Sequence, residues 1–267
     1  MSDALPTLYL PHGGGPCFFM DWTMGPRETW DRMGAWLGGI AATLPAKPRA
    51  LLVISAHWEQ PVATVTSAAQ PPLVYDYSGF PPHTYELTWP AAGDPVLAAR
   101  VRELLSGAGI ESGEDTTRGL DHGTFVPLKL TFPDAEVPTV QLSLQQGLDP
   151  AAHLAIGRAL SPLRREGVFI VGSGMSYHNM RGFGRDSSLA ESQRFDAWLA
   201  QAVALPQAER ADRLTQWQGG PAARECHPRE EHLLPLMVCA GAAGPDAGAR
   251  TFHDRVMGVE VSAHRFG

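Results

Sequence analysis

The chain has 267 residues, a length that one large α/β domain or two small domains can fill. Hydrophobic residues make up 44% and charged residues 18%, which excludes the composition of a disordered chain. The net charge of -7 and the absence of a Lys/Arg cluster exclude a basic surface for a phosphate backbone, so we expect no nucleic-acid partner.

Residues 1–11 lack a charged segment followed by a long apolar one, and no run of about 18 apolar residues occurs along the chain. We therefore expect no membrane partner and a cytoplasmic protein. The three cysteines, Cys17, Cys226 and Cys239, form no Cys-x-x-Cys pair. An odd number of cysteines without an export signal indicates reduced thiols rather than a disulfide framework.

Short β-rich runs bounded by polar, Gly or Pro residues predict buried strands at residues 7–10, 50–55, 62–66, 137–142 and 168–172, with a final pair around 255–261. Helical spacing and good helix formers predict helices at residues 28–44, 95–105, 150–164, 189–202, 208–217 and 230–240. This alternation predicts an α/β fold with a central, mostly parallel or mixed sheet flanked by helices. Without a repeat or a Gly/Ser linker, residues 1–267 are expected to form a single domain.

Residues 70–95 differ from the rest because they are rich in Pro, Gly and aromatic residues. The aromatic side chains are Tyr75, Tyr77, Phe80, Tyr85 and Trp89. A long irregular segment in a compact domain is typical of a functional loop or lid. The alternative is a surface loop that is merely anchored by its aromatic rings.

Histidines follow several of the predicted strands. His12 follows the first strand, His57 the second, and His178 lies just past the strand that ends at residue 172. In open α/β sheets, ligands bind beyond the carboxyl ends of the strands. We therefore expect these histidines, and the active site, at the carboxyl edge of the sheet.

His12 precedes the glycines at residues 13–15, which allow a tight turn and the close approach of a ligand. A glycine turn that happens to include a histidine is the alternative, and the phosphate-binding Gly-x-x-x-x-Gly-Lys-Ser/Thr pattern is missing. His57 ends an apolar strand, either as a ligand or as the cap of a hydrogen-bond network. Glu59 is the predicted carboxylate acceptor for its second ring nitrogen.

Three more histidines have suggestive neighbours. His122 is preceded by Asp121, which is expected to orient its ring. His178 follows small residues after a strand, or else lies at a helix start capped by Ser176. His232 is predicted to open an apolar helix and to point away from its neighbour Glu231, since successive helical residues are about 100° apart.

Several histidines at one sheet edge together predict a metal site, and imidazole ligands suit Zn, Fe, Cu or Ni. The other histidines lack this context and are interpreted as exposed or structural. They are His83, His153, His227, His253 and His264.

The chain resembles the class III extradiol ring-cleavage dioxygenases, in particular the DOPA 4,5-dioxygenase-like branch. Six ordered motifs carry the resemblance: Pro-His-Gly-Gly-Gly-Pro from residue 11, Ser-Ala-His-Trp-Glu from 55, Tyr-Asp-Tyr-Ser-Gly-Phe-Pro from 75, Asp-His-Gly-Thr-Phe-Val-Pro-Leu from 121, Gly-Ser-Gly-Met-Ser-Tyr-His-Asn from 172 and Glu-His-Leu-Leu-Pro-Leu from 231.

The resemblance implies a mononuclear non-haem metal with His12, His57 and His232 as ligands. It also implies that His178 is the catalytic base or a fourth ligand, and that His122 is an acid/base on the substrate and oxygen side. Better-known class III enzymes use two histidines and a glutamate, whereas a histidine occupies the third position here.

The implied substrates are a catechol-type aromatic diol and O₂, with Fe(II) required for activity and Zn(II) an alternative occupant in purified protein. Substrate contacts are expected from Tyr75, Phe80, Asp121 and Ser176. Two other functions stay open: a zinc hydrolase on the same histidines, and a non-enzymatic binding relative. Amphipathic helices in the second half are compatible with a homodimer.

Overall fold

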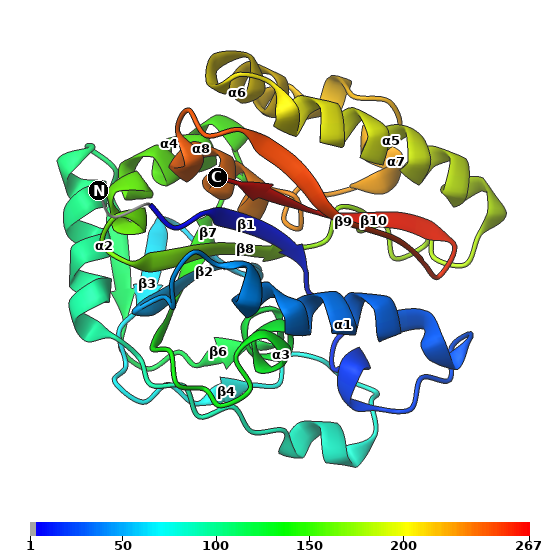
Figure 1. Ribbon diagram of the computed structural model, residues 1–267, viewed down its shortest axis with the longest axis horizontal. Coiled ribbons are helices and arrows are strands. Elements are labelled where there is room, and N and C mark those ends of the chain that lie inside the picture. The colour runs from blue at the N-terminus through cyan, green and yellow to red at the C-terminus, as the bar shows by residue number, and fades with distance from the viewer. Residues whose placement is uncertain (1–3) are drawn as a thin grey trace.

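The computed structural model describes residues 4–267. An eight-stranded sheet collects strands from both ends of the chain, in the order β5-β3-β7-β2-β8-β1-β10-β9 (Figure 1). Its strands are β1 (Thr7–Pro11), β2 (Ala50–Gln60), β3 (Ala63–Thr66), β5 (Ser112–Asp115), β7 (Thr139–Gln145), β8 (Val168–Gly174), β9 (Gly248–Val256) and β10 (Val259–Phe266). A small second sheet pairs β4 (Leu73–Val74) with β6 (Leu120–Asp121).

The central strands of the large sheet are parallel, and the next strand on each side is antiparallel to them. Strands β7, β2, β8 and β1 run parallel to one another, whereas β3 is antiparallel to β7 and β10 is antiparallel to β1. Strands β1 and β8 are buried along their whole length, as expected for parallel strands covered on both faces. The predicted α/β class with a mixed central sheet is confirmed.

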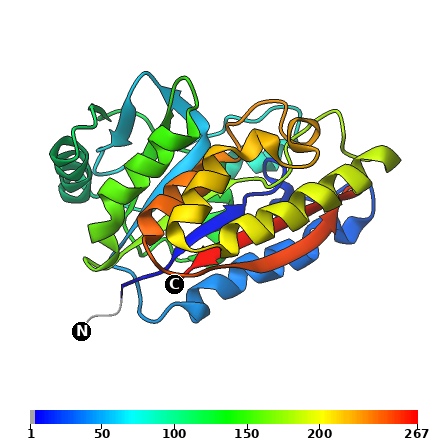
Figure 2. The same cartoon turned by 90° about the horizontal axis from the view of Figure 1, so that it is seen from above.

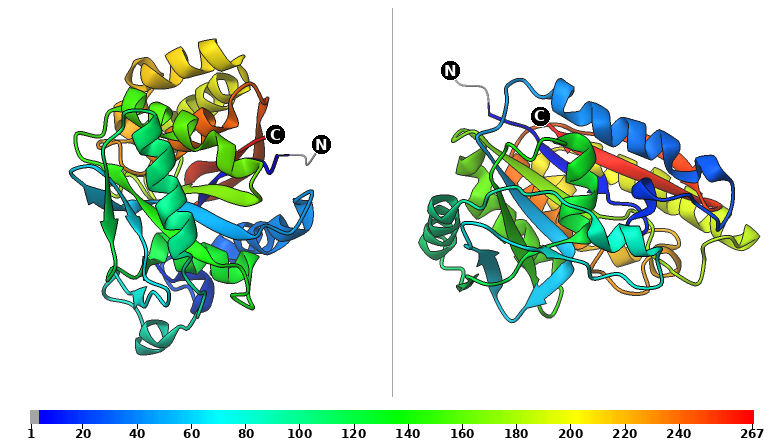
Figure 3. Two further views of the ribbon diagram at one scale, coloured as in Figure 1. Left: turned by 90° about the vertical axis from the view of Figure 1, so that its left-hand side faces the viewer. Right: turned by 90° about the horizontal axis from the view of Figure 1, so that it is seen from below.

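Helices cover both faces of the sheet. They are α1 (Asp31–Gly39), α2 (Pro95–Gly107), α3 (His122–Thr131), α4 (Pro150–Leu160), α5 (Asp186–Ala204), α6 (Gln207–Thr215), α7 (Ala223–Cys226) and α8 (Leu234–Ala243). Single 3-10 turns lie at Cys17–Phe19, Arg27–Trp30, Ile40–Thr43, Pro82–Glu86, Ser161–Arg164 and Trp217–Gly219. Seen from above, α4, α8 and α5 lie over one face (Figure 2), and the view from below shows α1 and α3 over the other (Figure 3).

Local sequence explains where several helices begin. Asp94 and Asp149 cap α2 and α4, accepting hydrogen bonds from the backbone N–H of Leu97 and Ala151, and a proline follows each cap. Helix α8 is apolar all round because it is buried between α4 and strands β8 and β1.

The structure differs from the predicted elements at several places, and strands β4, β5 and β6 and the short helix α7 were not predicted. Helix α3 was not predicted, because it begins with His-Gly-Thr and contains Pro127, which are poor helix signals. Helix α8 begins at Leu234, four residues later than predicted, so that His232 lies in the preceding turn. The final hairpin, predicted only around residues 255–261, extends over β9 and β10.

No helix within residues 4–267 is long and apolar enough to cross a bilayer. The three cysteines are buried free thiols.

Candidate active site

The site lies where the parallel strands end. Pro11 at the end of β1 pairs with Gly174 at the end of β8, and the backbone N–H of His12 donates to the Gly174 carbonyl at 3.1 Å. Ser55 of the adjacent β2 pairs with Ser173 of β8. The register of three parallel strands therefore delivers the next residues of each strand to one edge.

His57 belongs to β2 itself rather than following it. Between Ile54, opposite Leu142, and Glu59, opposite Leu144, the register of β2 against β7 shifts. Four residues of β2 therefore face one residue of β7. Such a bulge bends a strand and redirects its side chains, and here it contains His57.

His232 is held at the edge by its own backbone. Its carbonyl accepts hydrogen bonds from the Tyr9 hydroxyl at 2.7 Å and from the Met175 N–H at 3.2 Å. A Cβ atom at Gly174 would lie 2.1 Å from this carbonyl oxygen, so only glycine allows the approach. The Gly-Ser-Gly end of β8 thus seats the turn that carries His232.

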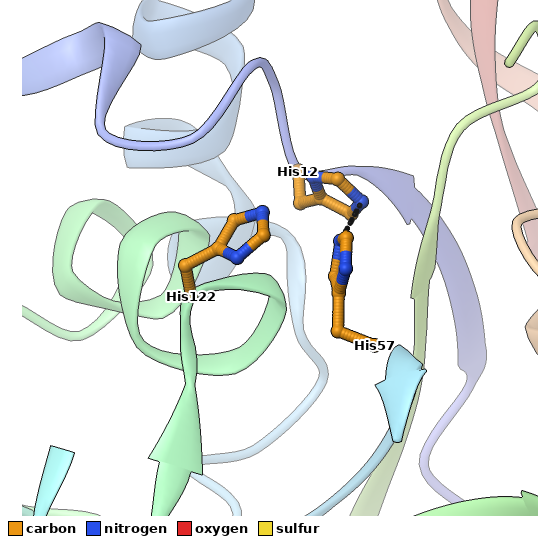
Figure 4. Close-up of side chains that lie close together, drawn as sticks. All are labelled: His12, His57 and His122. Carbon is orange, nitrogen blue, oxygen red and sulfur yellow. Dashed lines mark hydrogen bonds between the residues drawn. The ribbon is translucent and has the colours of Figure 1, made fainter. Parts of the chain in front are cut away.

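The imidazole rings of His12, His57 and His232 converge. The Nε2 atom of His57 lies 3.1 Å from Nε2 of His12 and 3.3 Å from Nε2 of His232. Figure 4 shows His12, His57 and His122 pointing toward one another from β1, β2 and the start of α3. Two nitrogen ligands that each lie about 2.0–2.1 Å from one metal are about 2.8–3.4 Å apart when the ligand–metal–ligand angle is between a right angle and the tetrahedral angle. Both separations from His57 fall in this range.

The outer ring nitrogens of His12 and His232 have acceptors. Nδ1 of His12 donates to the Gly13 carbonyl at 2.9 Å, and Nδ1 of His232 donates to Oε1 of Glu231 at 3.0 Å. Both rings therefore present an Nε2 lone pair to His57, and one proton on His57 can satisfy only one of them. A cation between the three rings would satisfy all of them, with the outer N–H bonds that metal-bound imidazoles usually make.

Burial keeps these rings neutral, which is their metal-binding form. Burial lowers the pKa of His12 and of His57 well below the usual value, and nearby histidines lower both further. Burial also lowers the pKa of His232 to about 3, despite the opposing bond to Glu231.

His122 is oriented by Asp76, which the sequence analysis overlooked. One oxygen of Asp76 accepts from the backbone N–H of His122 at 2.9 Å and from its Nδ1 at 2.8 Å. The other oxygen lies 4.0 Å from Nδ1 of His57. Burial alone would raise the pKa of Asp76, but the hydrogen bonds from His122 lower it. In the sequence, the signal for this role is the position of an acidic residue between Tyr75 and Tyr77.

His178 is oriented by Glu231, and the prediction that Glu231 points away from His232 is wrong. Oε1 of Glu231 accepts from Nδ1 of His178 at 3.1 Å as well as from His232. The two imidazoles stack with their centroids 3.2 Å apart. Residues 231–233 form a turn rather than a helix, which allows the side chains of Glu231 and His232 to bond to each other. A cavity of about 730 Å³ opens beside His178 and Glu231.

Two groups of side chains have potential ligand atoms within 4.8 Å of one another and could hold a metal ion: His12 with His57 and His122, and His178 with Glu231 and His232. The contact between His57 and His232 joins them. The acceptor role predicted for Glu59 is not observed, because Glu59 instead forms an ion pair with Arg229, at 2.7 Å between Nη2 and Oε2.

The aromatic segment forms a wall beside the histidines. Tyr77 meets His122 edge to face with their centroids 5.8 Å apart, and the Phe80 ring lies against Gly15. Tyr75 packs on Tyr77 and Phe125 instead, one layer further from His122. The hydroxyls of Tyr75 and Tyr77 donate to backbone carbonyls of the same segment, so these side chains offer ring faces.

Asp121 and Ser176, the other two residues predicted to contact a substrate, are buried. Asp121 is fully buried and accepts a hydrogen bond from Ser55 at 2.7 Å, so it neither orients the His122 ring nor reaches solvent. The Ser176 hydroxyl accepts from the Ser262 N–H at 2.7 Å on β10. Both residues support the strands beneath the site.

The remaining histidines lie outside these groups, as predicted. His83 and His253 are exposed, and His153, His227 and His264 are buried. His227, for example, packs against Phe195 and Trp217 and bonds to the Ser176 carbonyl. The three buried histidines are thus part of the packed interior rather than of the site.

Comparison with known proteins identifies the family of the chain. Residues 7–263 match the model of the family described as the catalytic LigB subunit of aromatic ring-opening dioxygenase. The chain belongs to this family. The resemblance inferred from the six motifs is thereby confirmed.

Named relatives cover most of this LigB family chain. It is 40% identical to a 4,5-DOPA dioxygenase extradiol of Beta vulgaris, over 78% of each chain. It is 37% identical to the dioxygenase tasH of Hapsidospora irregularis, over 98% of this chain and 85% of the relative. The crystal structure of an uncharacterised Escherichia coli K12 protein superposes with a TM-score of 0.78 at 29% identity, covering 98% of this chain and 100% of that one.

Proposed function

We propose that this LigB family protein catalyses extradiol cleavage of a catechol-type aromatic diol with O₂, at a mononuclear non-haem metal held by His12, His57 and His232. The observation that carries the proposal is the close approach of two Nε2 atoms, those of His12 and His232, to Nε2 of His57, at 3.1 and 3.3 Å. The outer N–H bonds of His12 and His232 supply the second requirement of such a site.

The metal we propose for activity is Fe(II). When bound, Fe(II) would supply a centre that binds both the diol and O₂ and passes electrons between them, which redox-inert Zn(II) cannot do. The same three neutral imidazoles suit Zn(II) equally well, so purified protein can carry zinc and be inactive.

In this proposal His178 is the base that accepts a hydroxyl proton from the diol. Its Nδ1 donates to Glu231, which leaves Nε2 as the basic nitrogen. The carboxylate stabilises the imidazolium that forms.

His122 is the second proton-transfer histidine in this proposal. Its Nδ1 is bound to Asp76, so its Nε2 exchanges the proton, and its ring centroid lies 4.0 Å from that of His57. We propose that His122 donates a proton to oxygen that derives from O₂. Tyr77 and Phe80 pack over the substrate ring and exclude water.

The decisive experiment is oxygen uptake by protein reconstituted anaerobically with Fe(II), on a panel of catechols. Uptake with a ring-opened product is expected from the iron form, and no uptake from a Zn(II)-loaded sample. His178→Ala should abolish turnover. A matched His253→Gln variant, which changes an exposed histidine on β9, should retain it.

Two results would redirect the proposal. Stoichiometric metal without oxygen uptake on any diol, but with ester or amide hydrolysis by the Zn(II) form, would favour a zinc hydrolase. Metal binding without either activity would favour a binding relative.

A further inference from the structure

Two carboxylates lie behind the histidines, outside the proposed ligand set. Glu231 contacts His232 and His178 through one oxygen, at 3.0 and 3.1 Å. Asp76 bonds to His122 at 2.8 Å and lies 4.0 Å from His57. Each carboxylate therefore faces one proposed ligand and one proposed proton-transfer histidine.

We infer that Glu231 and Asp76 are a pair of positioning residues, each of which orients a metal-ligating histidine and a proton-transfer histidine as one unit. The inference rests on the ligand set of the proposed function. It divides the site into two halves, with Glu231 serving one and Asp76 the other.

The Glu231 half is rigid because one atom fixes two rings. Both Nδ1–H groups point at Oε1, and the stacked rings are only 16° from parallel, so neither ring can turn without disturbing the other. Both rings are thereby kept in the tautomer with a free Nε2.

Glu231 is itself anchored from β2. Arg229 lies 3.4 Å from Oε2 of Glu231 and forms a two-pronged ion pair with Glu59, two residues beyond His57 in the chain. The turn that carries His232 is thus tied to the strand that carries His57. Glu59 therefore acts on the site through Arg229 rather than by bonding to His57.

The Asp76 half connects the aromatic segment to the site. Asp76 lies between Tyr75 and Tyr77, and it accepts two hydrogen bonds from the first residue of α3. The separation of 4.0 Å from His57 is longer than a hydrogen bond, so its hold on the ligand is electrostatic. We expect Asp76 to act mainly on His122 and Glu231 to act equally on both of its rings.

The test measures Zn(II) affinity by competition with a chromophoric chelator, and the absorption spectrum of the Co(II) form, in Glu231→Gln. Glutamine keeps the size and one acceptor oxygen but loses the charge. We expect Zn(II) affinity to fall about 10–100-fold, the usual effect of losing such an outer partner, and the Co(II) bands to shift. In a His178→Ala background the loss should persist, since His232 still loses its carboxylate.

The neighbouring glutamate provides the matched control. Glu230 forms an ion pair with Arg224, so Glu230→Gln removes the same charge one residue away and should leave affinity and spectrum unchanged. For Asp76→Asn we expect kcat to fall at least 10-fold with a smaller loss of Zn(II) affinity. Thermal unfolding of each variant checks the fold.

The outcomes distinguish a failure of this inference from a failure of the proposed function. Parental Zn(II) affinity and Co(II) spectrum in Glu231→Gln would overturn the inference, whatever the oxygenase activity. If the parent protein binds metal but never consumes O₂, the proposed reaction is wrong. The Zn(II) affinity and Co(II) spectrum of the variants then still decide whether Glu231 and Asp76 are positioning residues. A parent protein that binds no metal would overturn both.

Discussion

Gly174→Ala places one methyl group where β8 meets the turn that carries His232. The new Cβ would lie 2.1 Å from the His232 carbonyl oxygen and 3.1 Å from a ring carbon of Tyr9. The carbonyl would have to retreat by about 1 Å to reach van der Waals contact. It is bonded to the Tyr9 hydroxyl and the Met175 N–H, so the retreat weakens both bonds.

The expected cost is the sum of two effects. Overpacking costs about 1–3 kcal/mol, and the weakening of the two buried hydrogen bonds about 1 kcal/mol in all, so the free energy of unfolding should fall by about 2–4 kcal/mol. A ligand displaced by 1 Å should reduce kcat/KM about 100-fold. Urea denaturation measures the free energy of unfolding and oxygen uptake measures kcat/KM. Zn(II) competition should show a lower affinity than in the parent.

The matched control is Gly39→Ala at the end of α1, where an added Cβ meets nothing within 4 Å among residues 4–267. Its stability should equal or exceed that of the parent, because alanine favours a helix. If Gly174→Ala had the stability and Zn(II) affinity of this control, the account of how β8 seats His232 would be wrong.

Other predictions concern the fold. Burial lowers the pKa of His264 to about 3, so the unfolded chain binds its proton first as pH falls below about 6.5. The contribution of neutral His264 to the free energy of unfolding is therefore fully present above about pH 6.5 and is lost progressively toward pH 3, with about 2 kcal/mol lost at pH 5. In His264→Gln the free energy of unfolding should depend less steeply on pH. In Gly157→Ala the Cβ would lie 2.1 Å from the Val238 carbonyl across the α4–α8 contact, so denaturation should show a loss of about 1–3 kcal/mol. Arg164 is buried and donates to the Leu5 and Ala243 carbonyls; Arg164→Met should lower stability by about 2 kcal/mol or more, and thermal unfolding at parental levels would refute this.

The sequence predicted the fold class and the gathering of several histidines at one sheet edge, for a physical reason. Apolar β-rich runs separated by helical periods leave few architectures besides a helix-covered sheet, and parallel strands bring their carboxyl ends to one edge. His12, His57 and His178 could therefore be grouped from their places after strands. His232 was added by the motif resemblance, because nothing in its local context marks it as a ligand.

Tertiary structure decided which acids serve which histidines. Glu59 and Asp121 were chosen for being close in sequence, yet Glu59 bonds to Arg229 and Asp121 is buried beneath the site. The carboxylates that reach the rings are Asp76, 46 residues before His122, and Glu231, 53 residues after His178. Hydrogen-bond partners across such distances depend on how a bulge, a turn and an irregular loop meet in space. Local periodicity carries no information about that meeting, whereas it does fix which segments become strands and where they end.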